Sequence, residues 1–248
     1  MAAYSGLAGW YDVLMDDVDY PAWADYYLKL LQRAGVSPAR LCDCACGTGA
    51  MSVEFAARGI RVTGADLSGE MLEKAQARAR EKGVMAMFVK QDMCQLQMPR
   101  PVDALVCACD GVNYLISDDR LNAFFKNAHA AIRPGGALAF DISSAWKLEH
   151  TLGSNFFGED RDDVTYLWFN RFDESARTVT MELAFFVREK DGRYRRFDEI
   201  HVQKAHEAAH IEALLRENGF RDIQIFGDKT FEPPEKDAPR IHFLAARE

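Results

Sequence analysis

Three aspartates stand where successive short apolar stretches of the chain end, and these residues are well suited to binding chemistry. Asp43 lies in the stretch Leu41–Ala45, Asp66 closes the next stretch and Asp92 follows the third. If these stretches are parallel strands, their carboxyl ends meet at one edge of a sheet, where open α/β sheets bind ligands. A single aspartate is weak evidence, but three at consecutive strand ends predict a common binding site.

The first stretch runs into a loop of small residues, Leu41-Cys42-Asp43-Cys44-Ala45-Cys46-Gly47-Thr48-Gly49-Ala50. Its alanines and glycines let the backbone approach a ligand, and the helix that follows offers free N–H groups. A dinucleotide-binding loop would have glycine in place of Ser52, and the carboxylate of Asp43 would repel a pyrophosphate. A carboxylate there suits an ammonium group, so the loop favours a zwitterionic cofactor such as S-adenosylmethionine.

Asp66 and Asp92 both suit an adenosine group. Asp66 can accept hydrogen bonds from both ribose hydroxyls, a feature that dinucleotide enzymes share. Asp92 stands beside Met93, so its carboxylate could bind the adenine amino group while the apolar side chain covers the ring. These two residues support an adenosine-type ligand without choosing between the cofactors.

Reacting groups are expected at the carboxyl ends of the fourth and fifth predicted strands, in Cys109-Asp110-Gly111-Val112-Asn113-Tyr114 and at Asp141. A general base helps only when the nucleophile arrives protonated, as an amine or phenol does at neutral pH. Asp110 is the preferred candidate, although a loop carboxylate satisfied by backbone N–H groups is equally compatible with the sequence.

A later stretch adds a second set of titratable residues. Strict alternation in Phe197–Gln203 puts Glu199 and His201 on one face of a strand, together with Phe197 and Gln203. If this face covers the pocket, Glu199 and His201 would recognise or deprotonate an acceptor. If the face is turned to solvent, they are ordinary surface residues.

Periodicity predicts the elements that position these residues. After a helix over Pro21–Ala34, apolar runs alternate with amphipathic stretches up to Ser143, which is typical of a parallel sheet with helices on both faces. The elements that follow are β-rich stretches at Val164–Phe172, Arg177–Arg188 and Tyr194–Lys204, a helix over His206–Asn218 closed by Gly219, and strands at Arg221–Phe226 and Ile241–Ala246. We expect an α/β fold with a doubly wound, mostly parallel sheet and an antiparallel β insertion.

We expect a single domain over residues 1–248 with four parts. They are an N-terminal lid and leading helix (1–35), a cofactor-binding core (36–143), the β insertion (144–205), and a C-terminal helix and strand hairpin that complete the sheet (206–248).

Composition narrows the function classes. The 248 residues are 48% hydrophobic, and 30 Lys+Arg against 38 Asp+Glu give a net charge of −8, which argues against nucleic acid as a partner. The chain has neither an apolar run long enough to span a membrane nor a basic, apolar leader, so we expect a cytoplasmic protein without a membrane partner. The six cysteines form no CxxC pair and are expected to be buried thiols rather than metal ligands.

Four motifs in order resemble those of class I S-adenosylmethionine-dependent methyltransferases, and the resemblance runs from about Tyr4 to the end of the chain. DCACGTG is similar to the first motif, with Ala45 where many members have glycine, and GADLSGEML, KQDM and IRPGGALAFD match later ones. The resemblance implies S-adenosylmethionine as cofactor and a seven-stranded sheet whose last strand is antiparallel. The candidate cofactor-binding residues are Tyr20, Trp23, Asp43, Ala45, Cys46, Gly47, Gly49, Asp66, Leu67, Met71, Asp92, Met93 and Cys109.

A narrower resemblance, to small-molecule methyltransferases that include the glycine and amino-sugar N-methyltransferases, rests on the aromatic N-terminal segment and the β insertion. It implies that the N-terminal segment folds over the cofactor and that aromatic hydroxyls line the methyl-transfer site. Tyr11 is the candidate for that role, with Tyr20 and Trp23 as lid residues, unless these two merely fasten the leading helix to the sheet. The candidate catalytic residues are Tyr11, Asp110 and His201.

These features predict a methyltransferase that acts by direct displacement on an N or O nucleophile of a small molecule, with N preferred. The fourth strand ends in Cys-Asp-Gly-Val and lacks the Asn/Asp-Pro-Pro-Tyr/Phe sequence of exocyclic-amine nucleic-acid methyltransferases. The alternatives are an NAD(P)-dependent oxidoreductase on a related fold and a non-catalytic S-adenosylmethionine-binding protein. The protein is expected to be a monomer or a homodimer, because an antiparallel insertion can serve as a pocket cover or as a dimer edge.

Overall fold

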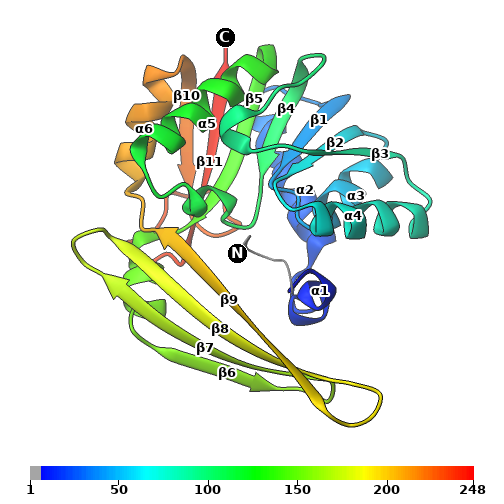
Figure 1. Ribbon diagram of the computed structural model, residues 1–248. Helices are drawn as coiled ribbons and strands as arrows, with labels where there is room; N and C mark the ends of the chain where they lie inside the picture. Colours follow the sequence, from blue (N-terminus) through cyan, green and yellow to red (C-terminus); the bar gives the residue numbers. More distant parts are fainter. Residues whose placement is uncertain (1–6) are drawn as a thin grey trace.

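The computed structural model describes residues 7–248 and places their strands in two separate sheets (Figure 1). The larger sheet has seven strands in the order β10-β11-β5-β4-β1-β2-β3. These are β1 (Arg40–Cys44), β2 (Arg61–Asp66), β3 (Ala86–Lys90), β4 (Val102–Cys107), β5 (Ile132–Ser143), β10 (Phe220–Phe226) and β11 (Arg240–Arg247). Strand β1 pairs in parallel with β2 and β4, so the strand order reverses beside β1. Parallel α/β sheets bind their ligands at such a switch point.

Helices cover both faces of this sheet (Figure 1). They are α2 (Tyr20–Arg33), α3 (Ala50–Ala57), α4 (Gly69–Glu81), α5 (Asp118–Ala131) and α6 (Ala208–Glu217). Buried side chains of α2 and α3 pack on one face, with Leu41 and Val106 of the strands, and those of α5 and α6 pack on the other, with Cys42 and Leu105. Successive side chains along the strands therefore pack into two cores, one on each side of the sheet.

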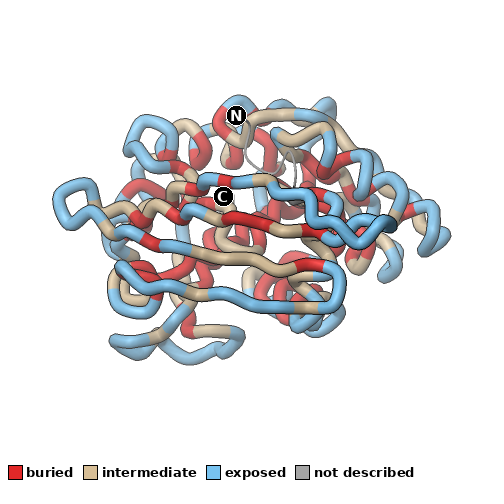
Figure 2. The backbone as a smooth tube through the Cα atoms, turned by 60° about the horizontal axis from the view of Figure 1, so that its bottom comes forward, coloured by how far each residue is buried: buried red, intermediate tan, exposed pale blue. Residues whose placement is uncertain are grey.

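The second sheet is an antiparallel sheet of four strands in sequence order. Its strands are β6 (Phe156–Asp160), β7 (Val164–Asp173), β8 (Thr178–Arg188) and β9 (Tyr194–Lys204). Figure 2 brings this sheet forward, with its turns exposed and its buried positions spread along the strands. The inward face of β9 carries Glu199, His201 and Gln203, all buried, whereas Ile200 between them is exposed.

The remaining helical segments of the described residues are short. They are the 3-10 helices η1 (Leu7–Gly9), η2 (Met93–Gln95) and η3 (Gly111–Tyr114), the α-helix α1 (Tyr11–Leu14) and the π-helix η4 (Lys147–Leu152). Helix α1 lies between the two sheets in Figure 1. Nothing in the described part of the chain is both helical and sufficiently long and apolar to cross a membrane.

The expected doubly wound sheet and its antiparallel last strand are confirmed, because β11 runs antiparallel to both β5 and β10. The insertion differs from the expectation, since it has four strands where the sequence predicted three. The missed strand, β6, is a short edge strand with exposed or half-exposed residues and a glycine at its centre, so it lacks the buried alternation that marks a strand in a sequence. All six cysteines are free thiols, five of them buried.

Candidate active site

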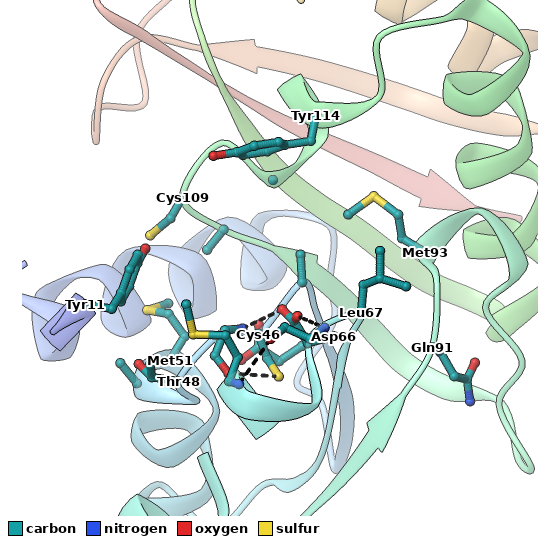
Figure 3. A pocket seen from close by; sticks show the side chains of 18 of the residues that line it. Tyr11, Cys46, Thr48, Met51, Asp66, Leu67, Gln91, Met93, Cys109 and Tyr114 are labelled. Atoms are coloured by element: carbon teal, nitrogen blue, oxygen red, sulfur yellow. Dashed lines mark hydrogen bonds between the residues drawn. The ribbon is translucent and has the colours of Figure 1, made fainter. Parts of the chain in front are cut away.

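A cavity of about 380 Å³ opens at the carboxyl ends of β1 to β4 (Figure 3). Most of the candidate cofactor residues line it, together with several to which the sequence gave no cofactor-binding or catalytic role. The expected residues in the lining are Tyr11, Tyr20, Asp43, Ala45, Cys46, Gly47, Asp66, Leu67, Met71, Asp92, Met93 and Cys109. The additional ones are Thr48, Ala50, Met51, Ser68, Gln91, Ala108, Gly111, Tyr114, Leu115 and Arg120.

The loop between β1 and α3 forms the floor of the cavity. Its backbone is left-handed at Ala45, Gly47 and Gly49, with φ of 56°, 52° and 74°. A Cβ on Gly47 would meet nothing within 4 Å, whereas a Cβ on Gly49 would lie 2.7 Å from the Cβ of Ala75. Gly47 thus leaves room for a ligand, and Gly49, which lies outside the lining, lets the loop pack against α4.

Asp43 is a buried carboxyl at the floor, 2% exposed, and its Oδ2 accepts a 2.5 Å hydrogen bond from the Ser52 hydroxyl. Burial raises the pKa of Asp43 to about 7, and the hydrogen bond from Ser52 opposes that rise. No positive side chain lines the cavity beside Asp43 in the described residues, where Arg120 is the one basic side chain of the lining. A cationic ligand group would stabilise the ionised form of this buried carboxyl, so Asp43 favours a ligand with a positive charge here.

Asp66 and Asp92 line the cavity from the ends of β2 and β3. The carboxylate of Asp66 accepts 2.8 Å hydrogen bonds from the backbone N–H groups of Gly47 and Ser68, and burial raises its pKa. Asp92 is partly buried, which favours its neutral form, but hydrogen bonds from the Cys94 N–H and from Arg120 hold its pKa below the usual value. The Asp66 carboxylate thus joins the end of β2 to the loop after β1, and the Asp92 carboxylate joins the end of β3 to Arg120 of α5.

The end of β4 has an unusual backbone. Cys109 and Asp110 are consecutive non-glycine residues with left-handed φ values of 59° and 53°. The carboxylate of Asp141, fully buried on β5, accepts hydrogen bonds from both of their backbone N–H groups, at 2.8 and 2.9 Å. It also accepts a 2.5 Å hydrogen bond from the Tyr27 hydroxyl. Asp141 therefore holds a strained turn in place at the cavity wall.

Arg240, at the start of β11, joins this network and was not predicted from the sequence. Its guanidinium is 15% exposed and forms ion pairs with Asp141 and, at 3.0 Å, with Asp110. Burial works against ionisation of Asp141, but Arg240 holds the pKa of Asp141 below its usual value. No local sequence signal could have found Arg240, because 130 residues separate it from Asp110.

The place of Asp110 differs from that expected for a general base. The carboxylate lies outside the cavity lining, with Oδ1 paired to Arg240 and Oδ2 accepting a 2.8 Å hydrogen bond from the Gln203 amide. These two partners fasten the turn after β4 to β11 and to β9. Both oxygens are engaged by side chains, whereas the alternative drawn from the sequence was a loop carboxylate satisfied by backbone N–H groups.

Tyrosine side chains gather at the other end of the cavity. Tyr11 from α1 and Tyr114 from η3 lie on either side of Cys109 (Figure 3), and Tyr20 from α2 completes this end. Burial raises the pKa of Tyr11 well above its usual value, so its hydroxyl keeps its proton at physiological pH. His201 lies outside the lining, behind Tyr114, with Nδ1 3.3 Å from the Tyr114 hydroxyl.

Trp23 was expected to bind the cofactor or cover it as a lid, but it lies in the core beneath α2. Its ring packs against Tyr27 and His242, with centroids 6.2 and 5.8 Å away, and the guanidinium of Arg240 lies over it at 5.1 Å. This position matches the alternative in which the residue fastens the leading helix to the sheet. Helical periodicity places Trp23 on a buried face without indicating which buried feature it meets.

Helix α1 is fastened from both sides. Asp12 accepts a 2.7 Å hydrogen bond from the Thr48 hydroxyl in the cavity floor and forms an ion pair with Arg78 of α4. From the second sheet, Arg161 bonds the carbonyl oxygen of Val13 and the carboxylate of Asp16. The segment that carries Tyr11 therefore bridges the two sheets over the cavity. Tyr4, where the family resemblance begins, lies outside the described residues.

Comparisons with known proteins agree with this geometry. The profile of the methyltransferase domain family matches residues 41–136. The protein of Geobacillus sp. (strain WCH70) named "Putative methyltransferase GWCH70_2453" is 35% identical over 245 residues, which cover 98% of this chain and 99% of that protein. The chain belongs to the class I S-adenosylmethionine-dependent methyltransferase family. The crystal structure of an S-adenosylmethionine-dependent methyltransferase from Clostridium acetobutylicum ATCC 824 matches the methyltransferase with a TM-score of 0.89, 32% identity and 98% coverage of both chains.

The names of more distant relatives of the methyltransferase state their substrates. A glycine/sarcosine N-methyltransferase of Halorhodospira halochloris is 25% identical over 253 residues, covering 96% of this chain and 85% of that protein. CalS10, an amino pentose methyltransferase from Micromonospora echinaspora whose structure holds S-adenosylmethionine, shares the fold with a TM-score of 0.73 and 22% identity, covering 93% and 92% of the two chains.

The cofactor of this methyltransferase is S-adenosylmethionine, and the described residues fit it. A buried carboxyl with a raised pKa faces the cavity at Asp43, the loop at Gly47 leaves open space, and apolar side chains at Leu67, Met71 and Met93 line the far wall. Bound there, the cofactor supplies an electrophilic methyl group on a sulfonium. Family membership favours this chemistry over the oxidoreductase alternative.

Proposed function

We propose that the methyltransferase transfers the methyl group to an amine of an uncharged or cationic small molecule, held at the tyrosine end of the cavity. The observation that carries this proposal is the distribution of charge in the lining. Asp43, Asp66 and Asp92 are acidic, and Arg120, the one basic lining residue among those described, pairs with Asp92 through bonds of 3.1 Å. An anionic acceptor would therefore meet no counter-charge from the lining beside Tyr11 and Tyr114.

We propose that the cofactor is held by the three carboxylates in the order of the strands. Asp43 receives the ammonium group, because a cationic partner relieves the desolvation of this buried carboxyl. Asp66 accepts from the ribose hydroxyls with the lone pairs that Gly47 and Ser68 leave open, and Asp92 accepts from the adenine amine. The residues proposed to contact the cofactor through shape rather than charge are Tyr20, Ala45, Cys46, Gly47, Leu67, Met71, Met93 and Cys109.

The catalytic task is to align the acceptor and to exclude water, since displacement at the sulfonium carbon needs no covalent nucleophile. Tyr11 supports this task from the lid, where its protonated hydroxyl can hydrogen-bond the acceptor nucleophile. Asp110 supports it from behind the wall through Arg240 and Gln203 rather than as a base. An O nucleophile fits the same lining, and the amine is favoured because the glycine/sarcosine relative is an N-methyltransferase.

Acceptor trials test the charge argument with matched compounds. The wild-type protein is incubated with S-adenosylmethionine and each of glycine, glycine methyl ester, glucosamine and catechol, and methyl transfer is followed by mass spectrometry. We expect methylation of glucosamine or the ester and little or none of glycine, which differs from the ester by its carboxylate. Preferential methylation of glycine would refute the proposed acceptor class, and methylation of catechol alone would move the proposal to an O nucleophile.

Two substitutions test the proposed roles of Asp66 and Tyr11. Asp66→Ala should abolish S-adenosylhomocysteine binding in isothermal titration, while Asp119→Ala, an exposed aspartate on α5, should leave it unchanged. Tyr11→Phe should keep the affinity within a few fold and slow turnover by a factor on the order of 10², the lower end for loss of one positioned hydrogen bond in a transition state. An unchanged turnover would remove Tyr11 from the catalytic residues.

A further inference from the structure

We propose that Tyr114 is a catalytic residue that receives the proton released by the acceptor and passes its own hydroxyl proton to Nδ1 of His201. This inference rests on the proposed methyl transfer to an amine. His201, which lies outside the cavity lining, acts through Tyr114 and is a positioning residue that also stores the proton. The sequence named His201 as a catalytic candidate and placed Tyr114 in the candidate stretch after the fourth strand without giving it a role.

The geometry of the pair supports the relay. Tyr114 ends η3, directly after the strained turn at Cys109-Asp110, and its ring lines the cavity. Its hydroxyl lies 3.3 Å from Nδ1 of His201, and the two rings meet edge to face at 76° with centroids 5.9 Å apart. Figure 3 shows Tyr114 at the same end of the cavity as Tyr11 and Cys109. A nucleophile at this end therefore lies within reach of the Tyr114 oxygen.

The second sheet fixes His201 in this position. In the register of β9, His201 is opposite Met181 of β8, and its side chain is 5% exposed on the inward face. The next inward residue, Gln203, donates to Asp110, which belongs to the turn before Tyr114. Strand β9 and helix η3 are thus joined at two successive inward positions, so the distance between the two rings is set by the fold rather than by a flexible side chain.

The surroundings of His201 leave its imidazole neutral and able to accept a proton. Burial lowers the pKa of His201, so its imidazole is neutral at physiological pH, and Nδ1 can accept from the Tyr114 hydroxyl in the Nε2–H tautomer. Glu199 lies two residues away on the same inward face, is itself buried and favours the charged imidazole. Met181 of β8 lies opposite His201 in the register, and Tyr114 of η3 lies against its ring.

The proton balance of the step is complete. The acceptor arrives as an ammonium, and its nitrogen loses a proton to the Tyr114 oxygen as the Tyr114 hydroxyl proton moves to Nδ1 of His201. The neutral nitrogen then forms the N–C bond as the S–C bond of the sulfonium breaks. The products are a neutral thioether, a methylated ammonium and an imidazolium beside Glu199, which returns its proton to water after the products leave.

Kinetics of three variants test the relay. Tyr114→Phe removes the hydroxyl, and His201→Asn keeps a hydrogen-bonding group near the Nδ1 position but cannot hold a proton. With whichever acceptor of the proposed-function trials the wild type methylates, we expect each variant to lose on the order of 10² in kcat, as for loss of a general base. The double variant should be no slower than the slower single one, because the two residues act as a unit. Affinity for S-adenosylhomocysteine should stay within a few fold.

Tyr194→Phe is the matched control, since Tyr194 is exposed at the other end of β9, and it should retain wild-type turnover. Wild-type turnover in His201→Asn, or losses that multiply in the double variant, would overturn the relay. In the wild type, kcat should also fall on the acid side as His201 protonates, and this limb should disappear in His201→Asn. A limb that persists in His201→Asn would belong to another group and would also refute the assignment.

A spectroscopic measurement tests the pair without any acceptor. Long-range ¹H–¹⁵N correlation of the histidine rings should show Nδ1 of His201 unprotonated near pH 7, with a nitrogen shift that changes in Tyr114→Phe. A protonated Nδ1 would overturn the relay and leave the proposed function intact. If the wild type instead methylates none of the acceptors in the trials, the proposed function fails, and the relay fails with it.

Discussion

Cofactor binding should depend on pH through Asp43, which is buried and carries a pKa of about 7. Its folded pKa lies above the usual carboxyl value, so the anion that attracts an ammonium group forms only as pH rises through neutrality. With that pKa, roughly 9% of the protein carries the anion at pH 6.0 and about 76% at pH 7.5. If only the anion binds the ammonium group, the affinity for S-adenosylhomocysteine should rise about eightfold over this interval.

Isothermal titration at several pH values measures this dependence. Asp43→Asn should bind S-adenosylhomocysteine weakly and with little change between pH 6.0 and 7.5, because its amide does not ionise. The matched control ligand is 5′-methylthioadenosine, which has the same adenosine and a thioether but no ammonium group, so wild-type affinity for it should change little over the interval. An affinity for S-adenosylhomocysteine that is flat in the wild type, or that rises equally in Asp43→Asn, would refute the assignment of Asp43 to the ammonium group.

The raised pKa of Asp43 also affects the free energy of unfolding. Between the unfolded carboxyl pKa near 4 and the folded value of about 7, the folded protein holds a proton that the unfolded chain has lost. Asp43 therefore lowers the free energy of unfolding as pH rises through this range, by up to about 4 kcal/mol for a shift of about three units. Asp43→Asn should consequently be more stable than the wild type at pH 7.5 without cofactor, and the difference should shrink towards pH 4.

Four further substitutions have expected outcomes. Arg240→Met should lower the free energy of unfolding in urea by about 3 to 5 kcal/mol, since it leaves the buried carboxylate of Asp141 without its cation; a loss below about 1 kcal/mol would contradict this. Gly47→Ala should cost about 1 kcal/mol for its left-handed backbone, and Gly49→Ala about 3 kcal/mol because it adds a clash at 2.7 Å; equal thermal shifts would remove the packing argument. Asp12→Asn should speed cofactor dissociation several fold in stopped-flow experiments, and an unchanged rate would show that this contact does not hold the lid.

Site residues whose position is set by the end of a strand, or by alternation along it, could be predicted from the sequence. Asp43, Asp66 and Asp92 are far apart in the chain, yet they line one cavity because parallel strands bring their carboxyl ends to the same edge. The alternation along β9 likewise placed Glu199 and His201 on one face, and the structure turns that face inward. In both cases, local periodicity combined with one rule of sheet geometry was sufficient.

The parts that depend on packing between distant elements could not be predicted. Trp23 has the helical spacing of a buried residue, but its contact with His242 on β11 decides that it fills the core rather than the cavity. Arg240 looks like an ordinary arginine at a strand start until β11 brings it beside Asp110 and Asp141. Side chains of this kind acquire their role from neighbours that no local pattern encodes.

The left-handed turn at Cys109-Asp110 has a consequence for how this enzyme could acquire new acceptors. Its shape is held by Asp141, which is fully buried and lies outside the lining, so the contour at the tyrosine end is set by a residue that does not face the cavity. Substitutions at Tyr27 or Arg240, which also hold Asp141, can therefore reshape that contour while every residue facing the acceptor stays the same. Directed evolution of substrate scope should include these buried positions in its libraries.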